Sequence, residues 1–430
     1  MIDLYKERFS ELLRRIETIN MDQSVNHDHM GSLFRRIEDD YRQIQGGLAA
    51  KREDLKIISN ILDHSYSSND NSIVQLKPAT DKAQHKLNNY AFFEMKERLI
   101  PFNLKKGDWL FKEGRIEEAL NAWEEVLKVN PDNEYVHSRL LQIMDTTQGP
   151  KVRAEELHSK YRFKYIGSFG QNILARPFAI VAGDHGDTLF VSDNVGNKIH
   201  KFNVHGKYLG PLPVEVKKPL GLFKDDENNI WICDFGNSRL LAVDSNGNMT
   251  DEISLKEILG DSFGSTHPVF GYLSDKRLYL LLLNKSYQQR MLVSFDRYNT
   301  YNSLDIFPTD ILQTPNFFRF IDNELYLCDY TQCALFVYNA KRKCVKQIGY
   351  QTISHPLRCF INLSNNLFLS AGKHILKVVL NGQSIFTANL PKILHTTQAN
   401  PYSLAVLKQE NIQVLFVMDG SLACIHKFAI

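Results

Sequence analysis

Residues 176–210 read RPFAIVAGDHGDTLFVSDNVGNKIHKFNVHGKYLG, and residues 218–252 read KPLGLFKDDENNIWICDFGNSRLLAVDSNGNMTDE. Aligned, both segments run from a proline through an apolar stretch, a polar turn and a second apolar stretch that ends in Asp. A turn containing Gly and Asn then leads to a third apolar stretch and a further turn. Short apolar runs separated by Asp, Asn and Gly are typical of β-strands joined by tight turns.

The same unit recurs four more times, in weaker form, down to the end of the sequence. Each unit opens at a proline, and neighbouring prolines are 41 to 49 residues apart: Pro177, Pro219, Pro268, Pro315, Pro356 and Pro401. A period of 40–50 residues with several short strands per unit is typical of a β-propeller. The sequence therefore predicts a six-bladed β-propeller over residues 161–430.

These repeats resemble the NHL-repeat family of six-bladed propellers. The resemblance rests on the proline-opened strands and on the turns formed by Asp193, Asn197 and Lys198 in one unit and by Asp234, Asn237 and Arg239 in the next. Asp329 and Asp419 keep only the acid, and the third and fifth units have Asn284 and Ala371 instead. The family includes binding proteins and enzymes alike, so the resemblance implies a fold and not a reaction.

The last repeat ends at Ile430 after three strand-like runs, which would leave one sheet edge open. Residues 161–170, YRFKYIGSFG, alternate between apolar and polar residues like a strand. We expect this segment to pair with the strand near 424–429 and so close the ring, since an open edge invites aggregation.

Residues 1–160 have a helical apolar period, and they carry 24 basic and 27 acidic residues. Two heptad seams lie within residues 1–63, the second of them formed by Met30, Phe34, Ile37, Tyr41, Ile44 and Leu48. The seams predict a coiled-coil-like helical hairpin. An alternative is a coiled coil with another chain, so Phe34, Ile37, Tyr41 and Ile44 are a candidate seam for interaction or self-association.

A polar linker is predicted at residues 64–80, followed by a helical segment at 81–160. Within it, residues 102–131 resemble a tetratricopeptide repeat (TPR) at Gly107, Leu110, Gly114, Ala119, Trp123, Val126 and Pro131. One such repeat needs neighbours to cover its faces. The whole chain is thus expected to be an α + β multidomain protein.

The composition limits which binding partners and which cellular compartment are expected. The formal net charge of +2 argues against DNA, whose binding proteins are usually distinctly basic. The longest apolar run, 278–283, is too short to enter a bilayer as a spanning helix, so membrane insertion is not expected. Six cysteines without a CxxC pair fit a reducing compartment, and the cytoplasm is the predicted location.

No motif for a nucleotide, a catalytic zinc ion or a serine nucleophile is present. Propeller hydrolases and lactonases hold a calcium ion in the central channel with Glu, Asn and Asp. The residues predicted to face the channel here, such as Phe178, Leu220, Asn316 and Tyr402, include no carboxylate. The sequence analysis therefore assigns no catalytic residue, no metal and no cofactor.

Repeat symmetry gathers one further set of side chains. The residues before the prolines include Arg176, Lys218, His267 and His355, and Arg358 follows two residues after Pro356. In a six-fold ring they would circle the mouth of the channel, where a cationic ring could attract an anionic ligand or an acidic peptide.

The functional prediction is a non-catalytic scaffold or adaptor, not an enzyme, whose helical part and propeller bind protein partners in an assembly. One alternative is a propeller lyase or hydrolase. Another is a single-stranded RNA-binding NHL propeller, which the mild charge of residues 161–430, 27 basic against 22 acidic, does not favour.

Overall fold

The computed structural model describes residues 2–17, 27–65, 80, 83, 95–145, 150–183, 186–260, 265–274, 276–284, 289–297, 303–307, 311–349, 353, 355–363, 365–380, 382–409 and 412–430. The predicted linker at 64–80 lies mostly outside these residues. The chain divides into two compact units, Met1–Tyr161 and Arg162–Ile430, and each is described by itself.

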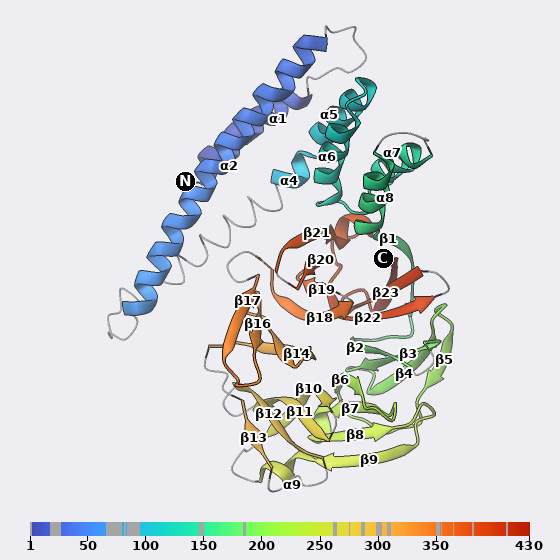
Figure 1. Ribbon diagram of the computed structural model, residues 1–430. Helices are drawn as coiled ribbons and strands as arrows, with labels where there is room; N and C mark the ends of the chain where they lie inside the picture. The colour runs from blue at the N-terminus through green and yellow to red at the C-terminus, as the bar shows by residue number, and fades with distance from the viewer. Residues whose placement is uncertain are drawn as a thin grey trace. The chain divides into compact units, whose positions relative to one another are not determined.

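The second unit is a six-bladed β-propeller, as the repeats predict. Each blade is a four-stranded antiparallel sheet, and the strands nearest the centre in Figure 1 are β2, β6, β10, β14, β18 and β22. The first four blades comprise β2 (Pro177–Ala182) to β5 (Tyr208–Pro211), β6 (Pro219–Lys224) to β9 (Met249–Ser254), β10 (Thr266–Ser274) to β13 (Asp305–Ile306), and β14 (Pro315–Ile321) to β17 (Cys344–Ile348). The fifth comprises β18 (Leu357–Leu363) to β21 (Ser384–Asn389).

The sixth blade joins the two ends of the propeller sequence. It contains β22 (Pro401–Gln409), β23 (Ile412–Asp419), β24 (Cys424–Ala429) and β1 (Lys164–Phe169). The pairing runs antiparallel from Lys164 opposite Ala429 to Phe169 opposite Ile425. The predicted closure of the ring by residues before the first repeat is therefore confirmed.

A buried Asp at the end of the second strand organises the repeat. Asp193 accepts hydrogen bonds from the backbone N–H groups of Ala175, Arg176 and Gly196, and Pro177 lies opposite it in the sheet. Asp234, Asp329 and Asp419 accept equivalent bonds in their own blades. The acid thus satisfies backbone donors of the loop before the proline and holds that loop against the end of the second strand.

The Asp193 carboxylate is expected to make the stability of the propeller depend on acid pH. Burial alone would raise the pKa of Asp193, but His200 and the three backbone N–H groups outweigh it and hold that pKa well below its usual range. The resulting stabilisation is complete above the unfolded-state pKa of about 3.9 and is lost as the pH falls through the folded-state pKa. Below about pH 4, the free energy of unfolding in urea should therefore change less with pH for Asp193→Asn than for the wild type. If the free energies of the two proteins fall in parallel as the pH is lowered, the expectation is wrong.

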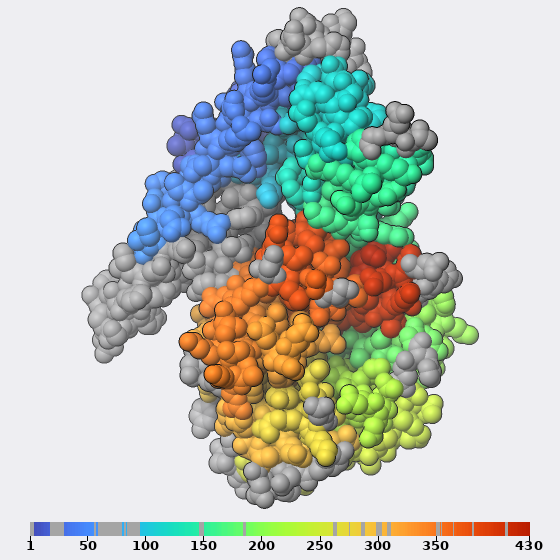
Figure 2. Space-filling model, in the orientation of Figure 1, coloured from blue at the N-terminus to red at the C-terminus, as the bar shows by residue number. Residues whose placement is uncertain are grey.

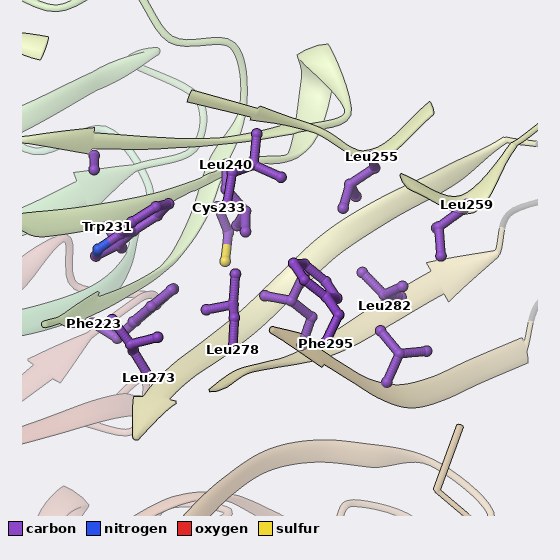
Figure 3. Close-up of a cluster of buried hydrophobic side chains, with 14 residues drawn as sticks. Phe223, Trp231, Cys233, Leu240, Leu255, Leu259, Leu273, Leu278, Leu282 and Phe295 are labelled. Atoms are coloured by element: carbon purple, nitrogen blue, oxygen red, sulfur yellow. The ribbon is translucent and has the colours of Figure 1, made fainter. Parts of the chain in front are cut away.

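The hydrophobic core lies between neighbouring blades. Figure 3 shows the cluster shared by the second and third blades, where Phe223 stacks on Trp231 and Leu278 lies between this pair and Phe295. Leu255 and Leu259 of the short helix α9 (Leu255–Leu259) cover its outer end. Figure 2 shows side chains of successive blades, from green through yellow to orange, in continuous contact.

The first unit is helical over its described residues. Its elements are α1 (Ile2–Glu17), α2 (His27–Ser65), α4 (Met95–Arg98), α5 (Ile100–Lys112), α6 (Ile116–Leu127), α7 (Glu134–Met144) and α8 (Lys151–Lys160). Gly107 on α5 lies directly against the Trp123 ring on α6, where any Cβ would clash. This close approach leaves Trp123 without solvent exposure.

Candidate functional site

The central channel of the propeller opens into a pocket of about 400 Å³ at the start of the innermost strands. We call this pocket the near chamber. Its aromatic walls are Phe178, Phe235, Phe270, Phe317, Tyr330 and Tyr402. Its polar lining comprises Arg290, Thr314, Asn316, Arg358 and Ser403, with no Asp or Glu among the described lining residues. A concave, mostly apolar pocket with a few convergent polar groups is the usual form of a small-molecule site.

Two arginines supply the charge of the near chamber, and one asparagine positions both. Arg290 Nη1 donates to Asn316 Oδ1 at 2.6 Å and to the Pro315 carbonyl at 2.9 Å. Asn316 Nδ2 in turn donates to the backbone carbonyl of Arg358 at 2.9 Å. Burial lowers the pKa of Arg290, while the charge of Asp329 opposes that shift. Arg290 still carries its charge at neutral pH, since an arginine guanidinium is effectively always protonated.

The Arg358 guanidinium lies between two aromatic rings. Its central carbon is 4.1 Å from the ring centre of Tyr402 and 5.2 Å from that of Tyr330. Its Nε is shielded from solvent and has no hydrogen-bond partner within the part of the chain that the structure describes. A buried donor without a partner costs free energy. The half-buried guanidinium lines the pocket, so a ligand of opposite charge can approach it there.

Of the five residues predicted to ring the channel mouth, only Arg358 lines the near chamber. Arg176 and Lys218 are exposed, and their backbone N–H groups donate to the side chains of Asp193 and Asn197. His267 is buried against Phe235, with its ring nitrogens 2.9 Å from the hydroxyls of Ser238 and Ser265.

The fifth residue of the ring, His355, is half-buried and stacks on His374, with the ring centres 4.5 Å apart. Burial and the neighbouring His355 lower the pKa of His374 to about 3, so His374 is neutral at physiological pH. A ring of five residues acting together as a binding surface stays a prediction.

The near chamber also contains residues that the sequence analysis did not single out as binding groups. Asn316 and Tyr402 directly follow the prolines of their repeats, which is a signal that places them at the channel. Arg290 lies on the third strand of its blade, opposite Leu283, and nothing in its local sequence indicates that it reaches the channel.

The candidate seam of the helical unit lies in the core of that unit. Phe34, Ile37 and Ile44 are buried with residues of α1 and α5, and Tyr41 packs partly buried against them. Phe34 contacts the rings of Phe102 and Trp109, both on α5. In the described residues the seam therefore packs within its own chain; its role in self-association stays a prediction.

The calcium ion of propeller hydrolases does not fit the near chamber, because its described lining contains two guanidinium groups and no carboxylate. Within the described residues, no three His, Cys, Asp or Glu side chains are grouped so as to hold a metal ion. No step of a mechanism is derived through a metal. The same residues contain no helix long and apolar enough to cross a membrane.

No model of a known protein family matches the sequence, and neither does any curated protein sequence. The propeller is similar to solved structures. Virginiamycin B lyase from Staphylococcus aureus is 13% identical, with 63% of this chain and 100% of that chain covered and a TM-score of 0.43. A gluconolactonase from Xanthomonas campestris is 12% identical, with 60% and 87% covered and a TM-score of 0.45. A luciferin-regenerating enzyme is 12% identical, with 61% and 95% covered and a TM-score of 0.46.

These similar structures are enzymes, and they contradict the prediction that the chain is a non-catalytic scaffold and not an enzyme. The lining of the near chamber shows why that prediction was poorly founded. It rested on the absence of carboxylates from the channel, which argues only against a carboxylate-held metal ion and leaves other polar groups to act. At these identities the likeness itself shows the fold alone, and no substrate is taken from it.

Proposed function

We propose that the propeller is an enzyme of the hydrolase or lyase kind, which acts on a small anionic substrate in the near chamber. One observation carries the proposal. Arg358 and Arg290 face an aromatic-walled pocket without a carboxylate in its described lining, and the Arg358 Nε has no protein partner there. Two guanidinium groups in a pocket with no Asp or Glu among its described lining residues favour a ligand that brings its own negative charge.

The same two groups suit the chemistry of the proposed class. Negative charge develops on a substrate oxygen when an ester or lactone is hydrolysed, and also when a lyase removes a proton next to a carbonyl. Donors that are fixed before the reaction, in a site with little water, stabilise such charge strongly. Asn316 fixes Arg290 through its side chain and Arg358 through its backbone, so Asn316 is a positioning residue.

Removing the Arg358 charge is expected to abolish turnover without unfolding the propeller. In Arg358→Gln the substrate loses a charged donor, which corresponds to a fall in kcat of about 100-fold or more. The full chain would be incubated with a metabolite extract and with a panel of lactones and carboxylate esters, and consumption followed by mass spectrometry.

Arg176→Gln, on an exposed residue outside the pocket, is the matched control and should consume the same compounds as the wild type. If wild type and Arg358→Gln consume the same compounds at the same rate, the near chamber is not the active site. If the wild type consumes nothing, the proposed enzyme is contradicted.

Three finer assignments belong with this proposal. The propeller is proposed as an NHL-type propeller, since in four of its blades a buried Asp holds the loop before the proline. The pair α5–α6 is proposed as a TPR-like unit on the approach of Gly107 to Trp123. A cytoplasmic location is supported by six cysteines that are all free thiols.

A further inference from the structure

The innermost strands enclose a second pocket farther along the channel. This far chamber, of about 370 Å³, is lined by the later residues of the same six strands, such as 180–182 of β2 and 361–363 of β18. It shares Phe270, Phe317 and Ser403 with the near chamber, so these residues mark the boundary between the two. The ring centres of Phe270 and Phe317 are 4.3 Å apart.

Arg319 is the residue that distinguishes the far chamber from an apolar channel lining. It lies in the sequence PNFFRFI of β14, between Phe318, which is fully buried, and Phe320, which packs on Tyr272 and Tyr279. The Arg319 side chain contacts the solvent of the channel, while the protein around it partly desolvates the guanidinium and lowers its pKa. A cation that lines a channel chamber with no acidic residue in its described lining is a functional candidate, because it can hold an anion there.

Two residues of the far chamber on the strands adjacent to β14 are polar, and none of its described lining residues is acidic. Tyr272 on β10 lines the same chamber, and its ring centre is 5.6 Å from that of Phe320, the residue next to Arg319. Asn362 on β18 has a side-chain Oδ1 that is shielded from solvent and lacks a hydrogen-bond partner in the described structure. The other end of that amide, its Nδ2, is an N–H donor. The other charged residue of the lining is also a cation, Lys224, whose Nζ lies 3.3 Å from Asn228 Oδ1.

We infer that the far chamber is a second binding site, specific for a small oxyanion held by Arg319, Tyr272 and Asn362. The planar guanidinium matches two oxygens of a carboxylate or phosphate, and the hydroxyl and amide supply further donors. The assignment does not depend on the proposed reaction, because it rests on a different chamber and on different residues.

The test measures how many anions the full-length protein binds. Isothermal titration with inorganic phosphate, and separately with acetate, is expected to give two equivalents for the wild type and one for Arg319→Gln. Arg358→Gln should lose the other equivalent, and the rim control Arg176→Gln should keep both. The anion that binds more tightly to Arg358→Gln identifies whether the far chamber takes phosphate or carboxylate.

Arg319→Lys keeps the positive charge but loses the planar guanidinium. We therefore expect it to bind the anion of the far chamber at least tenfold more weakly than the wild type. This variant keeps the test decisive if Arg319→Gln does not fold. Selenate soaked into crystals should give an anomalous peak between Arg319, Tyr272 and Asn362. A wild type that binds no anion, or an Arg319→Gln that folds and keeps both equivalents, overturns the inference. Loss of the near site alone in Arg358→Gln leaves the far site intact and concerns only the proposed function.

Discussion

A shortened chain that begins at Arg176 is expected to aggregate, whereas one that begins at His158 is expected to stay folded and monomeric. The first lacks β1, so β24 presents a whole edge of unpaired backbone groups. It also lacks Phe163, which stacks on Phe428 with ring centres 4.6 Å apart. Size-exclusion chromatography with light scattering, followed by thermal unfolding, measures the difference.

A third chain tests whether β1 stabilises the propeller through its strand pairing or through the packing of Phe163. Phe163→Ala in the chain from His158 removes the buried ring and keeps every hydrogen bond of β1. We expect this chain to be folded but less stable by about 3 kcal/mol. Equal solubility and equal melting of the chains from Arg176 and His158 would show that β1 does not close the ring.

Trp123→Ala is expected to destabilise the helical unit by about 3–5 kcal/mol and to leave the propeller folded. Trp123 is fully buried, packs against Phe111 with ring centres 5.7 Å apart, and fills the space that Gly107 leaves open. Its loss creates a cavity between α5 and α6 that Gly107 has no side chain to fill. Limited proteolysis should show new cleavage within residues 95–145.

Leu141→Ala is the matched control, because Leu141 lies in the same unit but is 46% exposed. Leu141→Ala should change the free energy of unfolding of the helical unit by no more than about 0.5 kcal/mol. Unchanged proteolysis of Trp123→Ala, or equal cleavage of both variants, would contradict the assignment of Trp123 as the centre of this helix pair.

The propeller was predictable because its repeat is encoded by local chemistry. Five of the six prolines begin or directly precede an innermost strand, and Pro268 is the third residue of β10. In four blades the proline lies opposite the buried Asp of the second strand. The pairing of proline with Asp fixes the register between the first and second strands of these blades. The positions of Pro and Asp in the sequence are therefore enough to place both strands. The short helix α9 and the two-residue strand β13 were not predictable, because they depend on packing against neighbouring elements and carry no pattern of their own.

The near chamber was only partly predictable. Arg358 is found by its spacing from Pro356, whereas Arg290 approaches the channel from the third strand of its blade through the length of its side chain. The heptad seam around Phe34 indicates a buried helical face, but a seam does not specify its partner. That partner, in the described residues, includes α1 and α5 of the same chain.

The pairing of β1 with β24 also has a consequence for biosynthesis. The first strand of the propeller to leave the ribosome is bound by the last, so β1 has no partner in its sheet until translation has reached Ala429. Blades one to five can form as their own consecutive strands emerge, since each is built from neighbouring segments. Ring closure is then the step of greatest sequence separation and the slowest to nucleate. A ribosome that stalls in the final repeat would leave an open ring with an exposed first strand, which chaperones and proteases can distinguish from the finished protein.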